Sequence, residues 1–150
     1  MPKGLKWVDI PPVWLVAFLV VGWLVAQALG TQSDWRWRLE GGSLVAIGVG
    51  LMVWAVVTMA RARTTVIPHM SPDALVTDGP FRFSRNPIYL GDGLVLAGAV
   101  LWWGAWPLLV LVPVFGWVIT ARFIRAEEAR LISHFGPQFH AWAAKTRRWI

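Results

Sequence analysis

The stretch IYLGDGLVLAGAVLWWGAWPLLVLVPVFGWVITARFI, residues 88–124, contains a single acidic residue, Asp92, in a largely apolar run. A membrane-spanning helix needs about 20 mostly apolar residues, so this stretch is too long for one span. It divides at WWGAWP, residues 102–107, because tryptophans suit the membrane interface while Gly and Pro suit a tight turn. We therefore expect helices over about residues 88–103 and 106–123. We also expect a kink at Pro113, because proline lacks the backbone N–H that a helix interior uses.

The composition of the whole chain is typical of a membrane protein. Of the 150 residues, 57% are hydrophobic and only 15% are charged, which leaves too little polar surface for a soluble domain. This length accommodates one domain, so residues 1–150 are treated as a single membrane domain. The absence of cysteine excludes disulfide frameworks and thiolate metal sites. The net charge of +6 comes from basic residues that flank apolar runs, a pattern of topology signals and anionic-lipid contact rather than of nucleic-acid binding.

Two further apolar runs, residues 12–29 and 41–60, are each long enough to cross a bilayer. The predicted fold is therefore all-α, an integral membrane protein with four transmembrane helices and a cytoplasmic C-terminal helical tail. The first run has an alternative interpretation, because Lys3 and Lys6 before it and AQA at residues 26–28 are also typical of a cleavable signal peptide. We expect this run to be retained as an anchor.

The orientation follows from the positions of Lys and Arg, which collect on the cytoplasmic side of membrane proteins. They are concentrated in the loop 61–87, in the tail 124–150 and at the N-terminus, whereas Arg36 and Arg38 are offset by Asp34 and Glu40. We therefore expect a protein of the inner (cell) membrane with both termini and the central loop in the cytoplasm. Tryptophans 35, 37, 102, 103 and 106 would then lie near the opposite interface.

The tail is predicted to form two cytoplasmic helices. The segment ITARFIRAEEARLISHF, residues 119–135, continues the last span out of the membrane, and Gly136-Pro137 then breaks the helix. The final segment, PQFHAWAAKTRRWI, has apolar and basic positions that predict a short interfacial helix lying back on the membrane.

Polar residues in the loop LVTDGPFRFSRNP, residues 75–87, come just before the third span. Gly79-Pro80 predicts a turn, Asn86 is a good N-cap, and Pro87 suits the first helical turn. A plain helix start would explain Asn86 and Pro87 without any function, but not the neighbouring Arg85.

Three carboxylates are expected on the same side of the membrane. Asp92 lies about one turn inside the third span, where a carboxylate is costly and suggests function, although it could simply cap or hydrate the helix end. Glu127 and Glu128 lie on the helix that leaves the fourth span. They could equally pair with Arg130 and Arg125 at i,i+3 spacing on the surface.

Other sites are not supported by the sequence. His69, His134 and His140 lack metal-ligand spacing, so no metal site is predicted. The GDG at residues 91–93 and the GVG at residues 48–50 follow helical sequence rather than a strand, so neither is a dinucleotide-binding fingerprint. No Ser-His-Asp or Cys-His arrangement is convincing.

Two segments resemble the isoprenylcysteine carboxyl methyltransferase and phospholipid methyltransferase superfamily of integral-membrane enzymes. TTVIPHMSPDALVTDGPFRFSRNPIYLG, residues 64–91, is similar to its Gly-Pro-aromatic-Arg and Arg-(His or Asn)-Pro-x-Tyr-x-Gly signature. EEARLISHFGPQFHAW, residues 127–142, is similar to its Glu-Glu-x-x-Leu and Phe-Gly-x-x-aromatic signature. The resemblance covers roughly residues 64–150. Asn86 stands where isoprenylcysteine enzymes commonly have His, while phosphatidylethanolamine methyltransferases also have Asn.

The resemblance implies S-adenosylmethionine as methyl donor, with S-adenosylhomocysteine as product, held between the last spans and the cytoplasmic tail. It implies the following donor-binding residues: Gly79, Pro80, Arg85, Asn86, Pro87, Tyr89, Glu127 and Glu128. The amides and dipole at the start of the third helix, with Arg85, would hold the donor's carboxylate. We expect Glu128 to hold its ammonium and to face Arg85, while Glu127 supports the pocket or pairs outward with Arg130.

The acceptor implied by the resemblance is amphiphilic and enters from the bilayer, but its reacting group stays open. A carboxylate acceptor needs a positioning cation, which Arg82, Arg85, Arg122 or Arg125 could supply. An amine acceptor must lose a proton, which Asp92 or Glu128 could accept. Arg85, Asp92 and Glu128 are thus the candidate catalytic residues. The alternatives are a non-catalytic sensor or scaffold that keeps the donor pocket, and a nicotinamide-dependent membrane reductase; the oligomeric state is not predicted.

Overall fold

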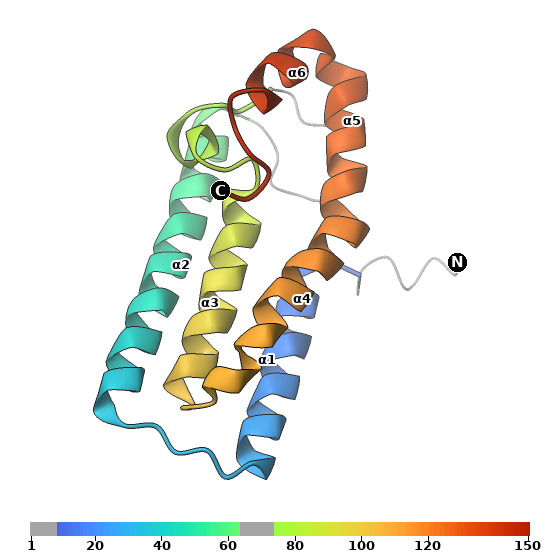
Figure 1. Ribbon diagram of the computed structural model, residues 1–150. Helices are drawn as coiled ribbons and strands as arrows, with labels where there is room; N and C mark the ends of the chain where they lie inside the picture. The colour runs from blue at the N-terminus through green and yellow to red at the C-terminus, as the bar shows by residue number, and fades with distance from the viewer. Residues whose placement is uncertain (1–8, 64–73) are drawn as a thin grey trace.

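The computed structural model describes residues 9–63 and 74–150, and this part of the chain contains helices and no strand (Figure 1). The α-helices are α1 (Pro11–Ala28), α2 (Trp35–Arg61), α3 (Pro87–Trp102), α4 (Leu111–Ile119), α5 (Arg125–Phe135) and α6 (Pro137–Ala143). Short 3-10 segments, η2 (Gly79–Arg82) and η3 (Trp106–Val110), precede α3 and α4. A π-helical turn, η4 (Thr120–Ile124), joins α4 to α5. Lys3, Lys6 and His69 lie outside the described residues.

The ends of α1 and α2 have local causes. Pro11 begins α1, where a missing N–H costs nothing, and the helix covers the predicted run 12–29. Helix α2 begins at Trp35, six residues before the apolar run 41–60 that is expected to cross the membrane. The reason is Asp34, whose carboxylate accepts hydrogen bonds from the backbone N–H groups of Arg36 and Trp37 and caps the helix.

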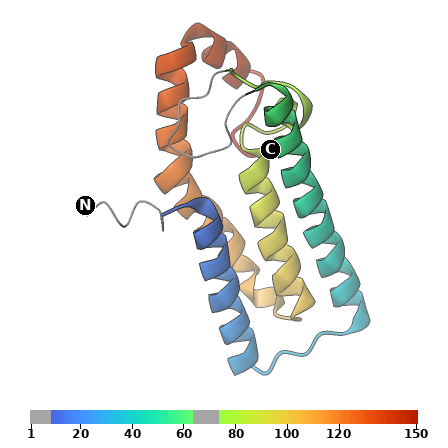
Figure 2. The same ribbon diagram turned by 180° about the vertical axis from the view of Figure 1, so that it is seen from behind.

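Helices α2 and α3 pack backbone to backbone. A Cβ added to Gly48 would lie 2.7 Å from the carbonyl oxygen of Gly91, and a Cβ on Gly91 would lie 2.7 Å from that of Gly48. Gly41 and Gly98 approach each other in the same way one heptad further along. Small residues at such contacts allow the close approach that holds helices together in membranes. This packing places α3 firmly against α2 and orients its other faces toward α1 and α4 (Figures 1 and 2).

The last span is one irregular helical stretch, Trp106–Phe135, of 30 residues. Pro113 lies near the beginning of α4, after the 3-10 segment η3, and the π-helical turn η4 follows α4. The kink expected at Pro113 itself stays a prediction. Figure 1 shows the axis changing direction between α4 and α5. Such π-helical turns re-aim the residues that follow them and are frequent at functional sites.

Three helices of the described chain are long and apolar enough to cross a membrane: Pro11–Ala28, Trp35–Arg61 and Trp106–Phe135. Helix α3, which corresponds to the third predicted span, is apolar but has 16 residues, which gives about 24 Å at 1.5 Å per residue. The surfaces of α1 and α2 are lined by exposed apolar side chains such as Val16, Leu24 and Val53.

The core lies where α1, α3 and α4 meet. Its buried residues are Tyr89, Leu96, Phe115, Ile119, Phe123 and Ile124. Phe18 of α1 packs edge-on against Phe115 of α4, with ring centroids 5.4 Å apart. This core fixes the beginning of α3 next to the turn η4, which is the part of the fold that positions the candidate site.

The C-terminal segment packs against the loop before α3, and its expected contact with a membrane surface stays a prediction. Gly136, with φ of +46°, ends α5 at the predicted break, and α6 then turns toward the loop before α3. Phe139 is buried, and the indole N–H of Trp142 donates to the carbonyl of Phe81 at 3.1 Å. The apolar face of α6 is therefore used by contacts within the protein, and residues 144–150 return to the start of α3 (Figures 1 and 2).

Candidate active site

The loop before α3 is held by the end of the chain. The backbone N–H of Arg85 donates to the carbonyl of Arg147 at 3.0 Å. The carbonyl of Arg148 accepts from the amide of Asn86 at 2.9 Å and from the hydroxyl of Ser84 at 3.4 Å. Asn86 occupies the N-cap position of α3, but its side chain makes no capping bond, so the expected capping role is wrong. Its amide instead ties the start of α3 to the C-terminal segment.

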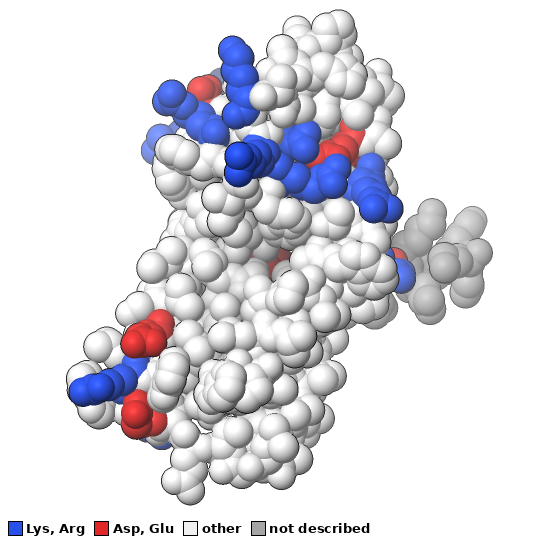
Figure 3. Space-filling view, in the orientation of Figure 1, with Lys and Arg blue, Asp and Glu red and all other residues white. Residues whose placement is uncertain are grey.

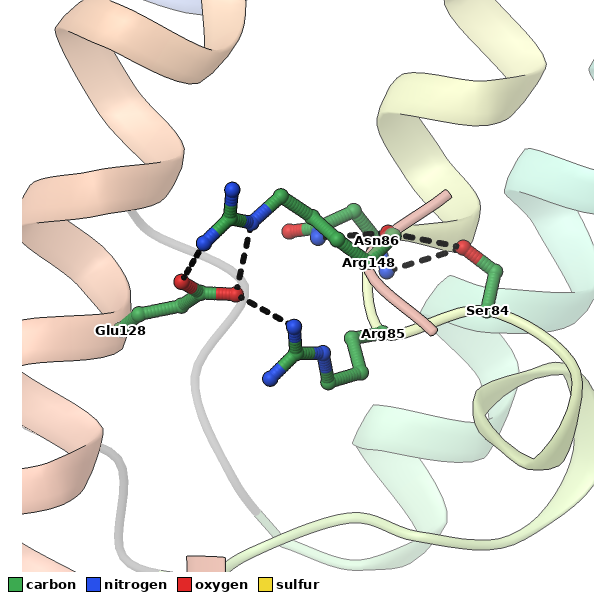
Figure 4. Close-up of polar contacts among 5 residues, drawn as sticks. All are labelled: Ser84, Arg85, Asn86, Glu128 and Arg148. Carbon is green, nitrogen blue, oxygen red and sulfur yellow. Dashed lines mark hydrogen bonds and ion pairs between the residues drawn. The ribbon is translucent and has the colours of Figure 1, made fainter. Parts of the chain in front are cut away.

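Glu128 lies between two arginines (Figure 4). Its carboxylate accepts a bidentate pair of bonds from Arg148, at 3.1 Å from Nε and 2.6 Å from Nη2, and lies 3.3 Å from Nη2 of Arg85. The side chains of Glu128 and Arg85 are only 14% and 15% exposed, so water screens this contact weakly. The hydrogen bonds to Glu128 raise the pKa of Arg148. Glu128 thus contacts Arg85 as expected. We name the following residues the Glu128 cluster: Ser84, Arg85, Asn86, Glu128 and Arg148.

Arg85 has an unused donor. Its Nε is buried and has no hydrogen-bond partner among the described residues. The guanidinium also lies over the ring of Phe139, 5.8 Å from the centroid. A buried N–H without a partner is costly unless a ligand accepts from it. This side chain is therefore suited to an anionic or carbonyl group of a ligand.

Glu127 points to a different partner from Glu128, as adjacent helical positions require. The hydroxyl of Tyr89 donates to its carboxylate at 3.2 Å. Tyr89 is buried in α3, so this contact joins the start of α3 to the start of α5. The two glutamates thus bind different partners: Glu127 accepts from Tyr89, whereas Glu128 contacts Arg85 and Arg148.

An apolar cavity of about 410 Å³ adjoins these polar groups. It lies between α3 and α4 and is named here the α3–α4 cavity. Tyr89 and Trp149 line it, together with Leu90, Gly93, Leu94, Ala97, Val112, Pro113, Phe115, Gly116, Trp117 and Thr120. A Cβ on Gly93 would meet nothing within 4 Å, so the missing side chain helps to leave this space open. Tyr89 therefore contacts an apolar and a polar environment: its ring lines the cavity, and its hydroxyl donates to Glu127.

Charge is distributed unevenly over the face shown in Figure 3. Lys and Arg form a band at the α5–α6 end, the middle of the face is almost uncharged, and a second small charged group lies at the other end. A hollow in the uncharged middle has an acidic group at its floor.

The remaining predicted residues lie around this centre. Asp92 is 6% exposed in α3, one turn after Tyr89, and interacts electrostatically with the Tyr89 hydroxyl. Pro87 begins α3 as predicted. Gly79 and Pro80 form the turn η2: Gly79 has φ of +57° and packs against Thr58 of α2, and the Pro80 carbonyl accepts from the backbone N–H of Ser84 at 3.2 Å. Gly79 and Pro80 thus support the loop that carries the Glu128 cluster.

Of the four arginines proposed as cations, Arg85 is the one at Glu128 in the described structure. Arg122 instead binds Asp9, with Nη2 2.7 Å from Oδ2, and its guanidinium lies 5.0 Å from the ring centroid of Trp14. The second cation at Glu128 is Arg148, which the sequence had not singled out. Trp149 and Ser84 were missed as well. The basic-aromatic ending RRWI was a signal, but nothing in its spacing shows that the chain folds back.

The family model for phospholipid methyltransferase matches residues 37–138, which is 102 of the 150 residues. The chain belongs to the phospholipid methyltransferase family. The resemblance found in the sequence is thereby confirmed. No curated protein and no solved structure matches the chain.

The family match indicates a membrane methyltransferase. The long apolar helices agree with an integral membrane protein. The match includes Arg85, Asn86, Tyr89 and both glutamates. It ends at residue 138, before Arg148 and Trp149. The C-terminal segment that binds Glu128 is thus a feature of this chain outside the matched region.

Proposed function

We propose that the protein transfers a methyl group from S-adenosylmethionine to the amine of a membrane phospholipid. The observation that carries this proposal is Tyr89, which lines the apolar α3–α4 cavity with its ring and binds Glu127 through its hydroxyl. Tyr89 thus connects the apolar α3–α4 cavity, which suits acyl chains, to the charged residues around Glu127, which suit a polar methyl donor. Trp149 also lines the cavity and directly follows Arg148 of the Glu128 cluster.

The residues of the site fit the donor's amino-acid end. The buried Nε of Arg85 is available to a carboxylate. A carboxylate has about four acceptor positions. Glu128 uses three for Arg85 and Arg148, which leaves one for the donor's ammonium. Glu128 also fixes the positions of both guanidiniums, so that these side chains do not have to rearrange when the donor's carboxylate binds.

S-adenosylmethionine would supply the methyl group: the acceptor nitrogen would form a bond to the methyl carbon as the carbon–sulfur bond breaks, and S-adenosylhomocysteine would leave. The protein has to align the acceptor with that carbon and exclude water. A lipid ammonium must first lose a proton, because its nitrogen has no free electron pair. Asp92, which is buried three residues after Tyr89 in α3, and Glu127, which accepts from the Tyr89 hydroxyl, are the proposed proton acceptors. A carboxylate acceptor would need a cation of its own, whereas Arg85 is assigned here to the donor's carboxylate and Arg148 makes a bidentate contact with Glu128.

The proposed topology has four spans, with both termini and the site on the cytoplasmic side of the inner membrane. Helix α3 would be the third span in chain order, lying between α2 and α4 and thus partly shielded from lipid despite its 16 residues. The basic band at the α5–α6 end supports this orientation (Figure 3). A reagent that labels a residue-1 tag only from the outer face would overturn it.

The test is incubation of the purified protein in phosphatidylethanolamine nanodiscs with methyl-labelled S-adenosylmethionine. We expect label in the phospholipid, and much less with Asp92→Asn or Glu127→Gln. Label in a prenylated cysteine carboxylate instead would contradict the amine assignment. Donor binding by calorimetry without turnover on any lipid would contradict catalysis and indicate a sensor, and binding of a nicotinamide cofactor in its place would indicate a reductase.

Calorimetry with S-adenosylhomocysteine separates the two glutamates. Loss of a charged hydrogen bond in a partly dry site costs about 1.5–3 kcal/mol, which is roughly a ten- to hundredfold loss of affinity. We expect that loss for Glu128→Gln and a smaller one for Glu127→Gln. Equal and negligible losses would contradict the assignment of both residues to the donor site.

A further inference from the structure

A second cavity is lined by residues of the end of α1, the α1–α2 connection, the beginning of α2 and the end of α3. Figures 1 and 2 show these segments at the end of the bundle opposite α5 and α6. Its volume is about 370 Å³, within the range of ligand pockets, roughly 300–1,000 Å³. It is lined by Trp23, Ala26, Gln27, Thr31, Gln32, Ser33, Arg38, Trp102 and Trp103. The proposed methyl transfer uses none of these residues.

The lining is rich in unused hydrogen-bond donors. The guanidinium of Arg38 and the side-chain amides of Gln27 and Gln32 form no hydrogen bond or ion pair with another described residue. The indole N–H groups of the three lining tryptophans are likewise unbonded within the described chain. The hydroxyl of Thr31, in contrast, is occupied, because it donates to the carbonyl of Trp103 at 3.0 Å.

Negative charge is absent from this lining. Asp34 lies nearby in sequence, but its carboxylate caps α2 through two backbone N–H groups. Glu40, the other acidic residue of the segment, does not line the cavity. A cavity with one guanidinium, several free N–H groups and no carboxylate is complementary to an anion that accepts several hydrogen bonds.

We propose that this second cavity binds the phosphate of a phospholipid headgroup, in the leaflet opposite the candidate active site, with Arg38 as its cation. Phosphate oxygens would accept from Arg38 and from the amides of Gln27 and Gln32. The position of the cavity selects a lipid over a free phosphate: it lies at the ends of the apolar helices α1 and α2, and its rim is aromatic. Tryptophans at such a level place their rings in the headgroup region of the bilayer. Leu29 and Trp106, which are two and three residues from the lining residues Gln27 and Trp103, have exposed apolar side chains that are available to acyl chains.

The test uses the detergent-solubilised full chain titrated with dihexanoyl phosphatidylglycerol, with binding followed as a rise in melting temperature and by native mass spectrometry. Arg38→Gln should weaken binding about ten- to hundredfold, as expected for loss of a charge-assisted contact. Arg36→Gln is the matched control, because Arg36 precedes Arg38 by two positions in α2, lies over the ring of Trp35 and does not line the cavity. It should change binding less than twofold. Gln32→Ala should give an intermediate loss.

Two further ligands identify what is bound. Inorganic phosphate and a diacylglycerol with the same acyl chains should each stabilise the protein far less than the phospholipid. Equal losses for Arg38→Gln and Arg36→Gln would overturn the proposal, because they would indicate a general effect of surface charge. Stabilisation by inorganic phosphate as strong as that by the phospholipid would overturn the lipid assignment. None of these readouts depends on methyl transfer, so the proposal stands or falls separately from the proposed function.

Discussion

Replacement of Glu128 by Gln tests the organisation of the candidate site most directly. The change removes the charge that two arginines share and places an amide NH₂ group opposite one of their guanidiniums. Breaking a fully buried pair costs about 3–5 kcal/mol, whereas an exposed pair is worth about 0–1 kcal/mol. Glu128 and Arg85 are nearly buried, while Arg148 is 38% exposed. We therefore expect the free energy of unfolding to fall by about 2–3 kcal/mol, between these two limits.

For a chain of this size, about 2–4 °C of melting temperature corresponds to each kcal/mol, so the expected fall is about 4–12 °C. The assay is thermal unfolding in detergent without donor. Glu40→Gln is the matched control, because Glu40 is exposed on α2, and it should change the melting temperature by about 1 °C or less. The double variant Glu128→Gln/Arg148→Gln should be less destabilised than the sum of its singles, because both remove the same contact. A Glu128→Gln protein as stable as the Glu40→Gln protein would refute the reasoning.

Three other predictions concern the packing of α3 on α2, the cap of α2 and the contact between Tyr89 and Glu127. Gly91→Ala should destabilise the protein by about 1–3 kcal/mol, because its Cβ would collide with the backbone of α2, whereas Gly93→Ala meets open space and should be tolerated; melting temperatures that fall equally would contradict the packing. Asp34→Ala should cost about 1 kcal/mol by loss of the cap of α2, measured by thermal unfolding, and no change would argue against the early start of that helix. Tyr89→Phe should lower stability by about 1 kcal/mol through loss of the bond to Glu127, and Tyr89→Phe in a Glu127→Gln background should then cost less.

Much of the fold could be predicted from the sequence because its causes are local. Pro87 suits the first turn of a helix because its φ is fixed near the helical value and the missing N–H has no intrahelical partner there. Gly136 ends a helix because it readily takes a positive φ. The six residues of α2 before the apolar run 41–60 were not part of the expected span because Arg36, Arg38 and Glu40 make the first turns polar, although Asp34 carried the capping signal. The contacts of α6 with the loop before α3 could not be predicted for a different reason, since an amphipathic helix packs its apolar face on protein or lipid with the same pattern.

The sequence by itself determined which segments are apolar helices, where proline and glycine begin and end them, and which family the chain resembles. These properties depend on residues close together in the chain, and apolar burial is not directional. Only the tertiary structure decided that Arg148 reaches Glu128, because that contact depends on the direction the chain takes after Gly136. It also decided that Tyr89 meets Glu127, 38 residues away, since this requires α3 and α5 to present particular faces to each other. Ion pairs and hydrogen bonds require their atoms within about 3–4 Å, and spacing along the sequence does not fix such distances between separate helices.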